Sequence, residues 1–180
     1  MRKALLLFAQ LNDRDVEWMA RNGQPAELAP GQRLIEAGQR ANAVYLVLEG
    51  SLTVHQGETA VARLGAGELV GEVSMVVHRP SSASVVADGH VHLLAIGIAH
   101  LRAHLARDID FAANFYHGLT MLLASRLRRT TRRLDKAVMM DTLRADETDE
   151  ELETDAVDGM RLAQERFARL VGRVAQPALV

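Results

Sequence analysis

Two stretches near the middle of the chain carry residues that could hold an anion. In the first, Gly67-Glu-Leu-Val-Gly71-Glu72-Val73-Ser-Met75, a glycine precedes a run at which a short helix can begin. Gly71 lets the backbone approach a ligand closely, and the free N–H groups of a helix that starts there would point at an anion. The second stretch, Ser81-Ser82-Ala83, comes soon after. These stretches form the candidate site.

The sequence shows no catalytic or metal-binding pattern beside this site. The absence of cysteine excludes disulfide scaffolds, thiolate zinc sites and a cysteine nucleophile. His100 and His104 are four residues apart, but no third ligand accompanies them, so we expect them to be exposed on a helix. No Ser/His/Asp order or carboxylate pair stands out. We therefore predict that the protein is not an enzyme and holds no metal or cofactor.

The charges divide the chain into three zones. Residues 1–110 carry a net charge of −2, residues 111–144 carry +5 and residues 145–180 carry −5, which suggests three pieces of structure. The apolar run after Met1 is too short for a signal peptide, and no stretch approaches the roughly 18 apolar residues of a membrane span. We expect a bacterial-type cytoplasmic protein without a membrane segment.

Short β-branched runs lie among ten of the thirteen glycines, between Gly23 and Gly97. Each run has four to seven residues and is bounded by glycine or proline, as strands are. The runs are 33–36, 43–48, 51–55, 59–64, 84–87 and 90–96. They predict a mainly β domain over residues 1–110, an antiparallel, jelly-roll-like roll. A helix over 13–22 should precede it, with Asn12 as its cap and Gly23 just past its end.

Residues 111–144 are predicted to form one long helix. Seam positions step alternately by four and three residues, which is a heptad pattern. They are Tyr116, Thr120, Leu123, Leu127, Thr130, Leu134 and Ala137. A second stripe, Phe115, Leu119 and Leu122, should pack on the roll. The pattern favours a homodimer through residues 111–137, with the arginines and lysine of 126–136 as a solvated flank. The alternative is one amphipathic helix on its own sheet.

The last zone begins with acidic residues. Residues 145–159 contain eight Asp and Glu and no Lys or Arg, so we expect an acidic linker or a frayed helix. Apolar residues then recur at helical spacing and predict an amphipathic helix over 160–176. It would dock on the same chain, on a dimer mate or on an outside partner.

Residues 30–50 resemble a known family. Pro30-Gly31, the turn glycine Gly38, the apolar strand Val44-Tyr-Leu-Val47 and Gly50 are similar to the first half of the cyclic-nucleotide-binding domain. This domain is the sensor of the catabolite activator protein and fumarate–nitrate regulator family and of cyclic-nucleotide-regulated kinases and channels. The resemblance covers about residues 10–136 and implies the β-roll fold.

The stretch from Gly67 to Ala87 resembles the phosphate-binding cassette of that family. The resemblance implies that Glu72 accepts hydrogen bonds from a ribose 2′-OH, and that Ser82 and the Ala83 amide donate to phosphate oxygens. Gly71 and Val73 belong to the same motif. The ligand would be cAMP, cGMP or a similar cyclic nucleotide.

One position departs from the family pattern. Members that bind cyclic nucleotides have arginine just before the Ser/Thr-Ala pair, where this chain has Ser81. Loss of one partner of a buried charge pair costs about 2–5 kcal/mol, so binding should be weak. Arg79, two residues earlier, either replaces that cation or faces solvent.

The long helix carries the last implied ligand contacts. In the catabolite-activator branch, two hydroxyl residues on this helix cap the purine base, and alignment places Thr130 and Thr131 there. The other interpretation makes Thr130 a seam residue and Thr131 an exposed one. No basic recognition helix is visible beyond it in the sequence, so we expect no sequence-specific nucleic-acid binding.

We therefore predict a regulatory, cyclic-nucleotide-binding sensor that signals through a dimer helix to a protein partner. The first alternative is a degenerate domain that binds no nucleotide and serves as a dimeric adaptor. The second is a transcription regulator of the catabolite-activator type without its own DNA-binding domain.

Overall fold

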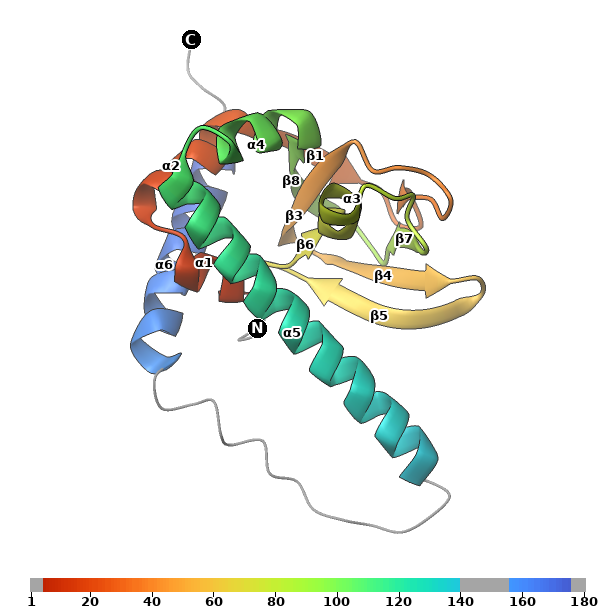
Figure 1. Cartoon of the computed structure of the whole chain (residues 1–180). Helices are drawn as coiled ribbons and strands as arrows, with labels where there is room; N and C mark the ends of the chain where they lie inside the picture. Colours follow the sequence, from red (N-terminus) through yellow and green to blue (C-terminus); the bar gives the residue numbers. More distant parts are fainter. Residues whose placement is uncertain (1–4, 140–155, 176–180) are drawn as a thin grey trace.

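A computed structural model describes residues 5–139 and 156–175 of the 180-residue chain. A β-roll forms one side of the molecule and a layer of helices forms the other (Figure 1). The long helix α5 (Ile109–Met139) begins in the helical layer, crosses in front of the roll and extends beyond it. This arrangement places one helix in contact with both parts of the molecule.

The roll consists of two four-stranded antiparallel sheets. The first has the order β1-β8-β3-β6, and the second has the order β2-β7-β4-β5. The strands of the first sheet are β1 (Gln24–Leu28), β8 (Val91–Gly97), β3 (Ala43–Glu49) and β6 (Leu69–Val70). Those of the second are β2 (Arg33–Ile35), β7 (Ser84–Ala87), β4 (Ser51–Gln56) and β5 (Thr59–Gly65). The predicted roll is confirmed, and all six predicted runs contain strands.

The two faces of the first sheet serve different cores. Val47 on β3 points into the roll, where it packs with Leu52 and Val85. Its neighbours Leu46 and Leu48 belong to a second core, shared with the helices. Side chains alternate across a strand, so β3 is buried on both faces and its sequence is a continuous apolar run.

Five helices besides α5 complete the described structure. They are α1 (Leu6–Gln10), α2 (Asp13–Asn22), α3 (Glu72–Val77), α4 (Ile98–Leu105) and α6 (Ala156–Ala175). The predicted helix 13–22 is confirmed as α2, with Asn12 and Asp15 forming a reciprocal capping box and Gly23 at its end.

The long helix starts two residues before the predicted 111. Asp108 explains this start, because its side chain accepts a 3.0 Å hydrogen bond from the Phe111 amide and so caps the helix. Residues 140–144 of the predicted helix lie outside the described residues, as do residues 145–155 of the predicted linker. Residues 156–159, assigned to that linker, are instead the start of α6. Acidic residues are favourable in the first turn of a helix, so acidic composition alone did not exclude one here.

Close packing fixes the first half of α5 against α1. A side-chain carbon placed at Gly118 would lie 2.8 Å from a methyl carbon of Leu7 and 3.0 Å from its Cα. Phe115, Leu119 and Leu122 are buried in the same helical core. The predicted inner stripe of α5 therefore packs between α1 and the outer face of the first sheet.

Candidate functional site

The candidate cassette begins at a glycine in the left-handed region. Gly71 has φ +88°, and a side-chain carbon there would lie 2.6 Å from the Ala43 carbonyl oxygen. Only glycine fits this conformation and this contact without strain. Helix α3 starts directly after Gly71, and the Gly71 carbonyl accepts a 3.2 Å hydrogen bond from the Met75 amide. The predicted helix start is therefore confirmed.

Glu72, the first residue of α3, is buried and paired with an arginine of α5. Its side chain is only 3% exposed and accepts a hydrogen bond from Arg126 Nη1. Burial raises the pKa of Glu72 above its ordinary value, while the Arg126 charge opposes this shift. Arg126 Nη2 also donates to the Leu69 carbonyl at 2.5 Å. Arg126 thus joins α5 to the strand and the helix on either side of Gly71.

A second ion pair lies beside the first. Arg129 Nη2 donates to Glu68 Oε1 at 3.1 Å, and the other oxygen of Glu68 accepts from the Gly65 amide at 2.8 Å. The Glu68 side chain is 8% exposed. Residues three apart on a helix share a face, so Arg126 and Arg129 both face the cassette. We call the pairs Glu72–Arg126 and Glu68–Arg129 the arginine ladder.

The arginine ladder corrects one sequence-based expectation. The heptad pattern predicts that the cations of 126–136 are the solvated flank of a coiled coil, but Arg126 and Arg129 are turned toward the cassette. The sequence signal for this pairing was the spacing of the charges. Arg126 and Arg129 are three residues apart on the helix, and Glu68 and Glu72 are four residues apart around the turn at Gly71.

The second stretch of the site is held to the roll by its backbone. The Ser81 amide donates to the Gln39 carbonyl and the Ser81 carbonyl accepts from the Gly38 amide, both at 2.8 Å. The Ser81 hydroxyl donates to the Ala83 carbonyl at 2.7 Å. Ser82 is exposed and Ala83 is half-buried. The Ser81 hydroxyl is therefore engaged within its own turn.

Arg79 and the α3 residue Val73 both face solvent. Arg79 is exposed and makes no hydrogen bond or ion pair with any residue that the structure describes. Val73 is 55% exposed. The exposed position of Arg79 agrees with the solvent-facing alternative.

The two threonines of α5 are exposed and engaged with their own helix. The Thr130 hydroxyl donates to the Arg126 carbonyl, and the Thr131 hydroxyl donates to the Leu127 carbonyl, both at 3.1 Å. Such bonds are local and do not prevent a hydroxyl from turning to a ligand. Thr130 is one turn beyond Arg126, which places it near the ladder.

The predicted seam of α5 lies open to solvent over its described part. Tyr116 is 47% exposed and Leu127 is 68% exposed, while Leu123 is half-buried. The side chains of Leu134 and Ala137 lie outside the described set. Exposed apolar residues in such a row commonly mark an interaction surface.

The histidines expected to be exposed behave differently from each other. His100 is exposed, and its Nε2 lies 2.9 Å from Asn22 Oδ1. His104 is half-buried and stacks on Trp18, with ring centroids 4.0 Å apart.

Within the described ranges no group of three or more His, Cys, Asp or Glu could hold a metal ion. No helix in the same ranges is long and apolar enough to cross a membrane.

The chain is similar to several known proteins. Residues 25–108 match the family described as "Cyclic nucleotide-binding domain". The cyclic AMP receptor protein of Thermus thermophilus is 34% identical over 134 residues, which are 72% of this chain and 60% of that protein. A cAMP-dependent protein kinase type II regulatory subunit of Drosophila melanogaster is 39% identical over 69 residues, 36% of this chain and 18% of that protein.

A solved structure supports the fold. A cyclic nucleotide-binding domain from Methylobacillus flagellatus has a TM-score of 0.66 at 23% identity, over 79% of this chain and 84% of that one. The chain spans less than two thirds of the length of the two curated relatives.

Proposed function

We propose that this chain, whose residues 25–108 match the cyclic nucleotide-binding domain family, is a regulatory sensor that binds cAMP, cGMP or a similar nucleotide weakly. The observation that carries the proposal is the buried Glu72 beside Gly71, joined to α5 by Arg126. A ligand that engages Glu72 changes the surroundings of Arg126. The long helix therefore receives the signal directly.

Five of the predicted site residues have a proposed contact with the ligand. Glu72 accepts from the ribose 2′-OH, while the Ser82 hydroxyl and the Ala83 amide donate to the phosphate. Thr130 and Thr131 approach the base. Amides and hydroxyls bind anions less strongly than a matched arginine does, and Ser81 supplies no charge. The Ala83 amide must also give up the 3.4 Å hydrogen bond that it donates to the Ser81 hydroxyl. Binding is therefore weaker than in family members with arginine at this position.

A dimeric adaptor that binds no nucleotide is the second candidate. It is favoured by the surroundings of Ser81, whose hydroxyl is engaged by the Ala83 carbonyl, and by the outward position of Arg79. Ser81, at the sequence position of the family arginine, carries no charge. A buried phosphate without a cation is costly, so this candidate predicts no binding at all.

Titration calorimetry of the full chain with cAMP and cGMP distinguishes the two candidates. The sensor predicts saturable heat with a dissociation constant in the high-micromolar to millimolar range. Ser82→Ala should weaken binding about tenfold or more, because a hydrogen bond to a charged group contributes about 1.5–3 kcal/mol. Thr59→Ala, another exposed hydroxyl far from the cassette, is the matched control. No heat from the wild type or from Ser81→Arg at millimolar nucleotide would establish the adaptor.

The dimer is proposed on the exposed seam of α5. Light scattering at micromolar concentration should show twice the chain mass of 19.7 kDa. Leu127→Asp places a charge in the seam and should return the mass to that of one chain, since a charged group at an apolar interface is costly. Glu58→Lys on the roll is the control for a charge change elsewhere. A wild-type mass of one chain would refute the dimer.

A further inference from the structure

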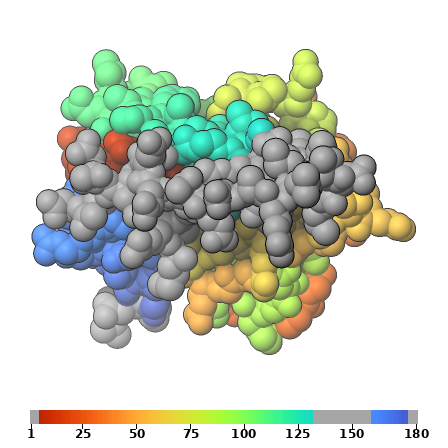
Figure 2. Space-filling model, turned by 90° about the horizontal axis from the view of Figure 1, so that it is seen from below, coloured from red at the N-terminus to blue at the C-terminus, as the bar shows by residue number. Residues whose placement is uncertain are grey.

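The C-terminal helix α6 docks on the N-terminal helices of its own chain. Ala163 and Leu170 are fully buried, and the Phe167 ring meets the Phe8 ring edge-on at 5.3 Å. In the space-filling view α6 lies beside the N-terminal helices, on the side of the molecule opposite the roll (Figure 2). Of the three docking modes left open by the sequence, the structure has the first.

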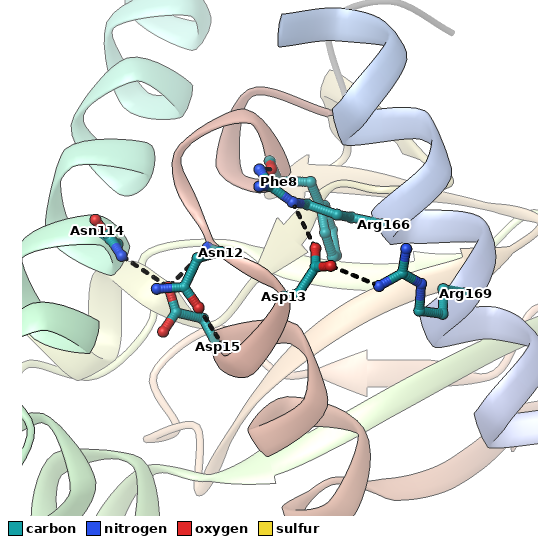
Figure 3. Close-up of polar contacts among 7 residues, drawn as sticks. All are labelled: Phe8, Asn12, Asp13, Asp15, Asn114, Arg166 and Arg169. Atoms are coloured by element: carbon teal, nitrogen blue, oxygen red, sulfur yellow. Dashed lines mark hydrogen bonds and ion pairs between the residues drawn. The ribbon is translucent and has the colours of Figure 1, made fainter.

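Ion pairs border this contact. Arg166 and Arg169 both reach Asp13, at 3.1 and 2.8 Å, and Arg173 pairs with Glu17 (Figure 3 shows the Asp13 contacts). The hydrogen bond from Arg169 is the main cause that lowers the pKa of Asp13. The side chains of Asp13, Arg169 and Arg173 are between 51% and 57% exposed. Those of Glu17 and Arg166 are 27% and 13% exposed, and Arg166 Nη1 also donates to the Phe8 carbonyl at 3.2 Å. Salt therefore screens the Asp13–Arg169 pair most and the pair of Arg166 least.

The surface between α2 and α6 is hollowed beside the ion pairs. A hollow of about 380 Å³ lies between them, over Val16, Ala20 and Leu170. Helix α6 also contains Gly159 and Gly172, and glycine lowers helix stability by about 1 kcal/mol relative to alanine. Few buried residues, screened ion pairs and weak intrinsic helicity are the features of a segment that opens locally, before the rest of the fold.

The docked helix is connected to α5 through one turn. Asp13, which pairs with arginines of α6, lies between Asn12 and Asp15. The Asp15 amide donates to the Asn12 side chain at 2.9 Å, and the Asn12 amide donates to the Asp15 side chain at 2.8 Å. Asp15 also accepts a 2.8 Å hydrogen bond from Asn114 Nδ2 on α5, as Figure 3 shows. The capping box of α2 is thus held from both sides.

We propose that α6 is a releasable clasp, which undocks while the roll and α5 stay folded. Undocking uncovers a face of α1 and α2 that binds a helix of the same chemistry, with an apolar stripe flanked by arginines. Asp13 and Glu17 select the arginines, and Phe8 and Val16 receive the apolar stripe. This proposal does not depend on a nucleotide.

Hydrogen exchange of the full chain, monitored by mass spectrometry, tests the release. The amides of α6 should exchange faster than those of β3, β8 and the first half of α5, and a rise from 50 to 500 mM salt should speed only α6. Arg169→Gln with Arg173→Gln should speed α6 exchange about four- to twentyfold, since an exposed ion pair accounts for a factor of about two to five. Arg161→Gln is the control, because Arg161 is exposed and pairs with no described residue. Exchange of α6 at the rate of the roll would overturn the proposal.

A peptide experiment tests the uncovered face. A fluorescein-labelled peptide with the sequence of residues 156–175 should bind the Arg169→Gln, Arg173→Gln chain at least fourfold more tightly than the wild type, whose own helix competes. The same peptide with both arginines replaced by glutamine should bind more weakly. No binding to a variant whose α6 is shown by exchange to be released would refute the helix-binding face.

Discussion

Replacement of Arg126 by methionine isolates the contribution of the arginine ladder. The change keeps an unbranched apolar stem, removes the guanidinium group and leaves Glu72 as a buried carboxylate without its partner. Loss of one member of a buried ion pair costs about 3–5 kcal/mol. Glu72 can reduce this cost by taking up a proton, because burial already raises its pKa from the ordinary value of 4.5. We expect a loss of about 3 kcal/mol at pH 7.5.

The pKa of Glu72 determines how the loss caused by Arg126→Met changes with pH. A carboxyl whose pKa is raised on folding binds its proton more tightly in the folded state, so its ionisation opposes folding as the pH rises above the ordinary value. Without Arg126 the pKa of Glu72 rises further, and each pH unit below that pKa relieves the variant of up to about 1.4 kcal/mol. The loss caused by Arg126→Met should therefore shrink to about 1 kcal/mol near pH 5.

Urea unfolding at both pH values measures this loss. Trp18 is the only tryptophan and packs against the helical core, so its fluorescence reports unfolding. The double variant Glu72→Leu, Arg126→Met should recover most of the stability, since apolar replacement of a buried pair is often neutral. Arg128→Met, at an exposed position of the same helix, is the control. A cost below about 0.5 kcal/mol, or one independent of pH, would refute the reasoning.

Three further predictions concern the cassette and the clasp. Ser81→Arg should raise the affinity for cAMP or cGMP by roughly 10- to 1,000-fold in calorimetry, whereas Arg79→Ala should leave the affinity unchanged. Loss of binding on Arg79→Ala would mean that Arg79 turns inward to the phosphate. Gly71→Ala should lower stability by about 2–3 kcal/mol in urea, because the new methyl meets the Ala43 carbonyl in a left-handed turn, and a cost near zero would show that the turn relaxes. The hydrogen bonds from Arg169 and Arg166 lower the pKa of Asp13 from its ordinary value of 3.8, so its stabilisation of the clasp is complete above that value and is lost as the pH falls through the lowered pKa. The exchange protection of α6 relative to Asp13→Asn should therefore fall toward one as the pH is lowered below about 4, and a constant ratio would contradict this.

The strands and α2 were predictable because local signals agree with tertiary packing. Glycines separate the runs, and Asn12 with Asp15 encodes the capping box of α2. Two strands were not found in the sequence. Strand β1 contains Pro25 and lies at a sheet edge, where proline is tolerated, and β6 has only two residues. Neither strand shows the alternation of apolar and polar residues by which a strand is recognised in a sequence.

The cassette was only partly predictable, because its polar partners come from distant segments. The pattern around Gly71 predicts the turn and the helix that begins there. It does not reveal that Glu72 and Glu68 meet Arg126 and Arg129, which lie more than fifty residues away. Arginines that flank a coiled-coil seam in solvent and arginines that pair with buried glutamates look the same in a sequence. Only the rotation of α5 on the roll distinguishes them.

This rotation also limits where the chain can change length. Each residue inserted into a helix turns the remainder of that helix by about 100° and moves it by about 1.5 Å. One residue added between Leu122 and Arg126 would keep the inner stripe in the core and turn Arg126 away from Glu72. Seven would restore its direction but carry it about 10 Å past the cassette. The β4–β5 turn at Gly57, which has open space around it, carries no such restriction. Among relatives that retain the ladder, insertions should accumulate at that turn and be absent between residues 122 and 126.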